Sequence, residues 1–239
     1  NWTVDNCKGY SLLIEVVPSH VCSASIRNVT INKKAIEQLF PEFARALSQN
    51  DVNNIKLSSV FETRIENVKN SYDINYISSI KVDNFGTLGF KSIVSTNQSI
   101  FAEMAMLEKT FGVENNENLY LNKLLPYFNT TFLHEWNGTI KDDGLLDIIH
   151  SFIKNKSPAF NQMNRYQLSV EAEKMITEAL QGQPGASDMV NPSISRFING
   201  AGEISLTINP LGDMSVHERA ELISGFNDFI EMFNVRLVN

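Results

Sequence analysis

A short unit that recurs is the feature of this sequence that most constrains its fold. The strand-like segment Asn28–Ile31 is followed by four apolar residues at helical spacing, and Asn137–Ile140 is followed by four more. The two sets are Ile36, Leu39, Phe40, Phe43 and Leu145, Ile148, Ile149, Phe152. A looser third copy, Ser205–Ile208, precedes a helical pattern that begins at Val216. This repetition predicts a fold built from strand-plus-helix pieces.

Composition places the chain among ordinary globular proteins. It has 239 residues, of which 43% are hydrophobic and 20% charged, which suits one large domain or two small ones. The formal net charge is −7 and the 20 basic residues are scattered, so a nucleic-acid partner is not expected. No run of 18 apolar residues occurs, so we predict no integral membrane segment.

Strict alternation gives the clearest strand, Ile55–Glu66, whose apolar residues alternate with Lys, Ser, Glu and Arg. This pattern is typical of a long antiparallel strand with one wet face. Tyr72–Val82 and Leu88–Ser95 are expected to continue the sheet through a turn at Asp83–Gly86. Further strands are expected at Tyr10–Val17, Ala24–Ile31, Tyr127–Ile140, Glu203–Asn209 and Val235–Val238.

Helical periodicity recurs between these strands. Helices are expected at Ala35–Leu47, Ile100–Phe111, Leu145–Ile153, Ser157 to about Tyr166, Leu168–Ala179, Asn191–Asn199 and Val216–Phe233. Pro41 should kink the first of these or start a new turn, and Ser215 with Glu218 fits a capping box. Gln183–Asp188 is rich in Pro and Gly and is expected to be a loop.

The predicted fold class is therefore α+β, with a largely antiparallel sheet, packed amphipathic helices and repeated strand–helix units. Residues 1–112 form a strand-rich half-domain and residues 113–239 a helix-rich one in this interpretation, with one continuous domain as the alternative. The connection Val113–Asn118 is the expected midpoint.

The two cysteines, Cys7 and Cys22, bear on the cellular compartment. An even count at short separation favours one disulfide in an exported protein, and two free thiols in a cytosolic protein are the alternative. If Pro18–His20 is a hairpin turn, Cys22 faces residue 16, so the bridge is not a simple cross-strand rung. The chain also opens at Asn1 without an initiating Met, as expected of a mature or trimmed protein. We therefore expect a periplasmic or extracellular location.

Motifs of phosphate binding and serine hydrolysis are missing from the sequence. There is no Gly-rich loop followed by Lys and a helix, and no Gly-x-Ser-x-Gly elbow. The four histidines, His20, His134, His150 and His217, lack the spacing of a zinc site. We therefore predict no cofactor and no metal.

Each residue with reactive chemistry has a simpler structural interpretation. His134 and Glu135 are adjacent on a strand and should point to opposite faces, so they should not act together. His150 is expected near a helix C-terminus, where a cation interacts well with the dipole. His217 and Ser224 are expected to be surface or packing positions. Asp142, Asp143 and Asp213 are expected at helix N-termini, where the helix dipole favours acidic residues. Cys7 has no histidine in a recognisable arrangement with it that could act as its base.

Several segments of the second half carry a family resemblance. They are Asp142–Leu145, Phe197–Gly200, Gly202–Pro210 and Phe233–Val235. Over residues 130–239 the chain resembles an uncharacterised class of exported proteins of alphaproteobacteria. The resemblance implies a location in the cell envelope and brings no catalytic residues with it.

The leading hypothesis is a non-enzymatic, exported binding or interaction protein of unknown specificity, which binds a protein partner or acts within the cell envelope. A carrier of a lipid or other apolar small molecule is the alternative. It rests on the 15 phenylalanines, of which Phe226, Phe229 and Phe233 share a helix face that should pack in the core or line a cavity. A hydrolase whose site is assembled from distant residues is the third hypothesis. No catalytic residue is predicted.

Overall fold

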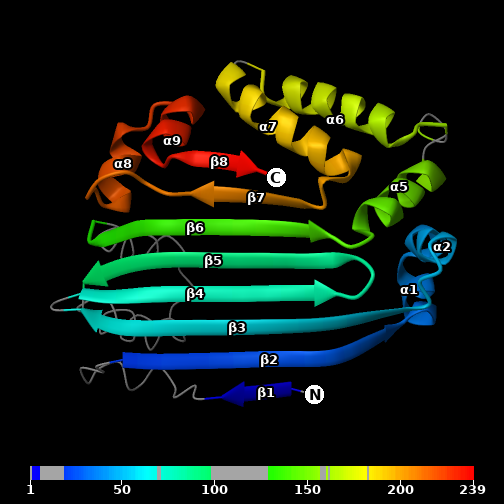
Figure 1. The fold of residues 1–239 in the computed structure, drawn as a ribbon, viewed down its shortest axis with the longest axis horizontal. Coiled ribbons are helices and arrows are strands. Elements are labelled where there is room, and N and C mark those ends of the chain that lie inside the picture. Colours follow the sequence, from blue (N-terminus) through cyan, green and yellow to red (C-terminus); the bar gives the residue numbers. More distant parts are fainter. Residues whose placement is uncertain are drawn as a thin grey trace, which may run out of the picture.

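A computed structural model describes residues 2–5, 19–68, 71–97, 129–156, 160, 162–181 and 183–239. Its strands form one eight-stranded antiparallel sheet in which each strand pairs with the next one along the chain (Figure 1). The strands are β1 (Trp2–Asp5), β2 (Ser19–Asn32), β3 (Asn54–Val68), β4 (Ser71–Val82), β5 (Gly86–Asn97), β6 (Thr131–Asp142), β7 (Glu203–Ile208) and β8 (Val235–Val238). The predicted α+β class is confirmed.

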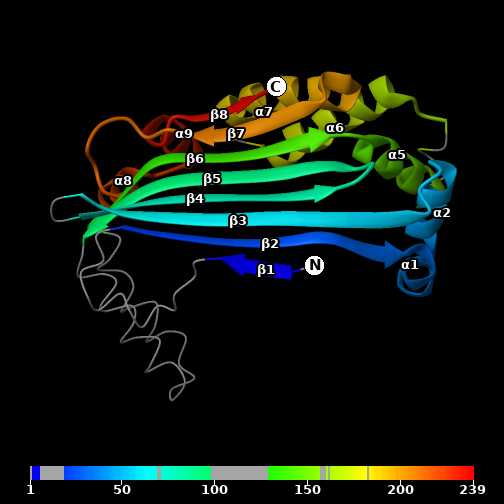
Figure 2. The same cartoon turned by 60° about the horizontal axis from the view of Figure 1, so that its bottom comes forward.

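Helices lie at one end of this sheet and along its β8 edge (Figures 1 and 2). They are α1 (Lys33–Leu39), α2 (Pro41–Gln49), α5 (Leu145–Lys156), α6 (Arg165–Ala179), α7 (Pro184–Arg196), the π-helix η3 (Phe197–Ala201), α8 (Val216–Leu222) and α9 (Phe226–Met232). The predicted strand Tyr10–Val17, the predicted helix Ile100–Phe111 and the predicted midpoint Val113–Asn118 lie outside the described residues.

The strand register sorts side chains by polarity between the two faces of the sheet. Ile80 of β4 pairs with Leu88 of β5, which pairs with Ile140 of β6, so the three form an apolar row. Farther along the same face, Phe61, Tyr76, Phe90 and Trp136 meet edge to face, with successive ring centroids 5.1, 5.3 and 5.2 Å apart. Such pairs add to the stability from burial alone.

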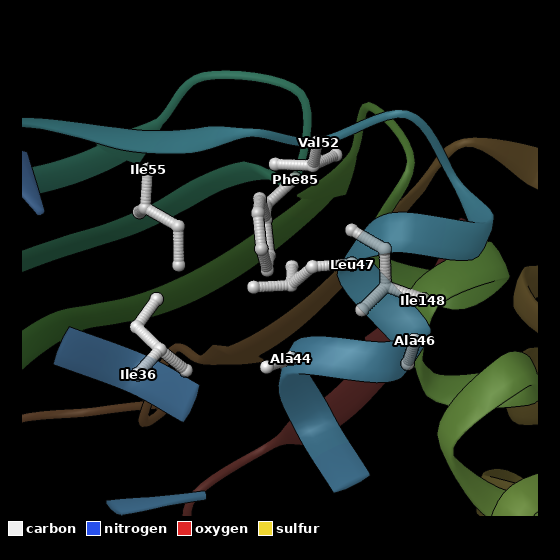
Figure 3. Close-up of a cluster of buried hydrophobic side chains, with 8 residues drawn as sticks. All are labelled: Ile36, Ala44, Ala46, Leu47, Val52, Ile55, Phe85 and Ile148. Carbon is white, nitrogen blue, oxygen red and sulfur yellow. The ribbon is translucent and has the colours of Figure 1, made fainter. Parts of the chain in front are cut away.

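A cluster of buried apolar side chains joins the end of the sheet to three helices (Figure 3). The cluster contains Ile36, Ala44, Ala46, Leu47, Val52, Ile55, Phe85 and Ile148. Phe43 of α2 packs against it and meets Phe152 of α5 edge to face at 6.1 Å. Pro41 begins α2, which confirms the predicted new turn and lets α1 and α2 present separate apolar faces to the cluster.

The hairpin turn before β5 holds the start of α5 in place. The Phe85 carbonyl oxygen accepts hydrogen bonds from the N–H groups of Asp143 and Leu145, each at 2.9 Å. Gly86 has φ +147°, and a Cβ there would lie 1.9 Å from the Lys141 carbonyl oxygen. Asp142 accepts from the N–H of Leu146 at 3.0 Å, which confirms its predicted role at a helix N-terminus.

The predicted strand–helix repeat is not confirmed as a structural unit. Phe43 and Phe152 occupy matching places, because both pack at the cluster. Leu39 and Ile148 do not match, since Leu39 is 73% exposed and Ile148 is 1% exposed. The strand ends therefore lead into helices that meet the core through different positions.

Two predicted helix boundaries in the second half are wrong. Gln183–Asp188 was expected to be a loop, but α7 begins at Pro184, because Pro is well suited to the first helical position, where no N–H partner is needed. The helix expected from Ser157 to about Tyr166 falls partly outside the described residues. Of the rest, residues 162–164 are not helical, and α6 starts at Arg165 behind an Asn164–Gln167 capping box.

The long helix expected over Val216–Phe233 is two helices, α8 and α9. The break falls at Ser224, whose N–H and hydroxyl both donate to the Asp228 carboxylate and hold the pKa of that group below its usual range. Arg219 fixes the fold-back, because its guanidinium donates to the carbonyl oxygens of Met232 at 2.8 Å and Leu211 at 2.7 Å. Helical periodicity continues through the break and hides it.

Candidate functional site

An apolar cavity of about 360 Å³ lies between α5 and α6 and reaches η3. Its lining residues are Leu146, Ile149, His150, Ile153, Phe160, Arg165, Leu168, Glu171, Ala172, Met175 and Ile198. Both helices contribute positions three and four residues apart, the spacing that puts side chains on one helix face. The sequence predicted Leu168, Ala172 and Met175 as a packing face, and the structure places that face along an open cavity.

Polar groups at this cavity are tied to neighbours. Arg165 forms an ion pair with Asp147 of α5, and Lys174 lies 3.9 Å from Glu171. Nε2 of His150 lies 2.9 Å from the Met163 carbonyl oxygen. A carbonyl oxygen accepts only, so Nε2 carries the proton in this bond. The predicted dipole role of His150 is wrong, because α5 continues six residues further to Lys156.

The described lining of the cavity has the polarity and size of a site for an apolar molecule. Its surface is almost wholly apolar, and its size is at the lower end of the range for small-molecule sites. Met175 is largely exposed at the cavity, and Met adapts its shape to irregular apolar surfaces. Arg165 and Glu171 are charged groups in the lining, and the described lining residues include no serine or cysteine.

A cluster of polar side chains that the sequence did not reveal spans three strands, on the face of the sheet opposite the aromatic side chains of Tyr76 and Phe90. Ser95 of β5 donates its hydroxyl proton to Asp73 of β4 at 2.7 Å, and its Oγ lies 2.5 Å from Nε2 of His134 of β6. A hydroxyl has one proton, so Nε2 donates to Oγ when Asp73 receives the Ser95 proton. A serine nucleophile requires the reverse, with the histidine accepting the serine proton. The geometry therefore fits a cross-strand clamp better than a hydrolase site.

A β-bulge in β6 explains why this group was missed. Ile93 pairs with Glu135 and Val94 pairs with Leu133, so His134 is an extra residue in its strand. Glu135 bonds Lys91 at 2.8 Å, and His134 bonds Ser95. Lys91 and Ser95 lie on the same face of β5, so His134 and Glu135 share a face as well. The prediction that they point to opposite faces is wrong, because it assumed regular alternation.

The remaining candidates have structural surroundings. His217 lies 3.1 Å from Glu221 on the surface of α8, and Asp213 is exposed. The predicted capping box is confirmed, and its bonds from Ser215 hold the pKa of Glu218 below its usual range. In the stripe on α9, Phe229 and Phe233 have ring centroids 5.1 Å apart, and Phe233 is buried below Arg219. The stripe does not line the cavity between α5 and α6.

Three observations concern other kinds of site. Within the described part of the chain, no three His, Cys, Asp or Glu residues lie close enough to hold a metal ion. No helix there is long and apolar enough to cross a membrane. Cys22 lies in β2 opposite Thr63, whereas Cys7 lies outside the described residues, so their disulfide stays a prediction.

No family model matches this chain, and no similar curated protein or solved structure was found.

Replacing Ser95 with Ala tests the cross-strand clamp. S95A removes the hydroxyl that joins Asp73 to His134, so we expect the free energy of unfolding to fall by about 1 kcal/mol. Urea unfolding at neutral pH measures the change. The control is S79A, because Ser79 lies on the same face of β4 and should change stability by less than about 0.5 kcal/mol. Equal effects of the two substitutions would contradict the clamp.

Proposed function

We propose that this protein acts by binding, without catalysis, and that it carries an apolar small molecule between α5 and α6. The observation that carries the proposal is the cavity of about 360 Å³ with its apolar lining. Of the hypotheses drawn from the sequence, the carrier has a matching site in the described residues. The protein-partner hypothesis has a different surface to support it, which is treated below.

Burial of apolar surface would drive such binding. Each methylene group that leaves water contributes about 0.8 kcal/mol, so a chain of about eight would contribute roughly 6 kcal/mol before the costs of association. The cavity is about large enough for a short acyl chain or a small ring system. The side chains of Arg165 and Glu171 are 35% and 36% exposed, so they can contact both a polar ligand end and solvent.

Filling the cavity tests the carrier. A172W places an indole among Leu168, Met175 and Ile149, so we expect the affinity for the fluorescent ring compound 8-anilinonaphthalene-1-sulfonate to fall at least about tenfold. A fluorescence titration measures the affinity, and circular dichroism checks that the fold is kept. The matched control is A179W, at the exposed end of the same helix, which should bind as the unchanged protein does. Undiminished binding by A172W, or no binding by the unchanged protein, would refute the carrier.

The proposed location is periplasmic or extracellular, and it rests on the cysteine pair and on the resemblance of residues 130–239 to exported proteins. A disulfide between Cys7 and Cys22 would suit an oxidising compartment. Closing a loop of about fifteen residues would stabilise the fold by roughly 3 kcal/mol in the chain-entropy model.

Thiol labelling tests this location. Protein taken directly from its native compartment and unfolded without reductant should have no free thiol, and reduction should release two. Mass spectrometry after alkylation counts the labels. Two labelled thiols before reduction would remove the argument for export.

A further inference from the structure

The outer edge of β2 is longer than the strand that covers it. β2 has 14 residues, but β1 pairs with only Ser23–Ile26. In both views β1 stops short of the end of β2 that leads into α1 (Figures 1 and 2). No other described strand pairs with this edge. Because alternate residues of an edge strand direct N–H and C=O groups outward, the stretch can accept another extended backbone.

A β-bulge marks where the open stretch begins. The register of β2 against β3 shifts between Ile26 and Val29, and Asn28 has φ 57°. Bulges discourage pairing along an edge. Beyond the bulge the regular register returns, with Val29 opposite Leu57 and Ile31 opposite Ile55. The accessible edge is therefore Val29–Asn32.

Side chains at this edge suit an alternating strand. Val29 and Ile31 are 40% and 39% exposed, and they lie on the apolar face of the sheet with Leu57. Thr30 lies on the other face, next to Lys56. An incoming strand that alternates apolar and polar residues would extend the apolar face with one set and the polar face with the other.

The opposite edge of the sheet, β8, is bonded to a helix. Ser193 of α7 donates its hydroxyl proton to the Leu237 carbonyl oxygen of β8 at 2.9 Å, and the Asn239 side chain donates to the Ser193 carbonyl oxygen at 2.8 Å. α7 thus bonds to the β8 backbone at Leu237, whereas β1 pairs with β2 only at Ser23–Ile26 and does not reach Val29–Asn32.

Basic residues lie around Val29–Asn32, and their charge determines which extended peptides this edge should favour. Lys33 and Lys34 follow β2, and Lys56 flanks it. The acidic residues nearby are paired with other lysines: Glu37 with Lys33 at 3.8 Å, Asp83 with Lys81 at 3.9 Å and Asp143 with Lys141 at 3.6 Å. Lys34 and Lys56 are exposed and belong to no ion pair among the described residues. In a chain of net charge −7, this is a locally basic corner. Complementarity therefore favours an acidic strand.

We propose that the β2 edge Val29–Asn32 binds an acidic extended peptide segment of a partner protein as an added antiparallel or parallel strand. Backbone hydrogen bonds hold the segment, the side chains of Val29 and Ile31 contact its apolar residues, and Lys34 and Lys56 contact its carboxylates. This surface is separate from the cavity between α5 and α6, so each proposal can fail without the other.

The test uses three peptides of the same length. The probe is acetyl-Glu-Val-Glu-Val-Glu-Val-Glu-amide, the charge control replaces every Glu with Lys, and the backbone control is the probe with every backbone amide N-methylated. An NMR titration of ¹⁵N-labelled protein at low salt should shift the amide signals of Val29–Asn32 with the probe. The Lys peptide should bind at least about tenfold more weakly. The methylated peptide should not bind, because it lacks donors toward the edge.

Protein variants locate the contact. K34E and K56E should each weaken probe binding by about fivefold. The control K174E changes a lysine on α6, which lies beyond the opposite edge of the sheet, and should leave binding unchanged (Figure 1). The proposal is overturned if the probe fails to bind, if the methylated or Lys peptide binds equally well, or if shifts map away from Val29–Asn32. Concentration-dependent dimers that protect this edge without peptide would also overturn it in favour of a second copy of the chain.

Discussion

Much of this structure depends on the close contact between the Asp83–Gly86 turn and the start of α5. Phe85 points into the buried cluster while its carbonyl oxygen accepts from the N–H groups of Asp143 and Leu145. Gly86 permits this contact, because a side chain at its φ of +147° would collide with the Lys141 carbonyl oxygen. One turn thereby joins the β4–β5 hairpin, the end of β6 and the first residues of a helix.

The position of α5 then follows from packing on both of its sides. Ile148 and Phe152 face the cluster and contact the elements around α2, while Ile149 and Ile153 face α6 and line the cavity. A helix with apolar residues on both sides needs a packing partner on each side. In the described structure the second partner, α6, does not fill the space beside α5, and the cavity remains between them. The cavity is thus a product of helix placement at the end of a sheet, and a bound apolar molecule would complete the burial that α6 leaves unfinished.

Local patterns predicted much of the fold. Alternation identified β3 to within two residues at either end, and the predicted Ser215–Glu218 capping box and Pro41 break are both present. The failures arise where the outcome depends on distant parts of the chain. The break between α8 and α9 depends on Arg219 reaching Met232 and Leu211, and the placement of His134 depends on a bulge opposite Ile93. The cavity was not predictable, because the periodicity of Leu168, Ala172 and Met175 is the same whether a helix face is filled or open.

Hydrogen exchange in the Gly86→Ala variant tests most directly whether the Phe85–Gly86 turn positions α5. The account predicts that the amides of Leu145–Lys156 lose protection while those around Phe61 of β3 and Tyr76 of β4 keep most of theirs, because the added Cβ displaces the Lys141 backbone from the turn. Unchanged protection of α5, or an equal loss across the whole sheet, would contradict it.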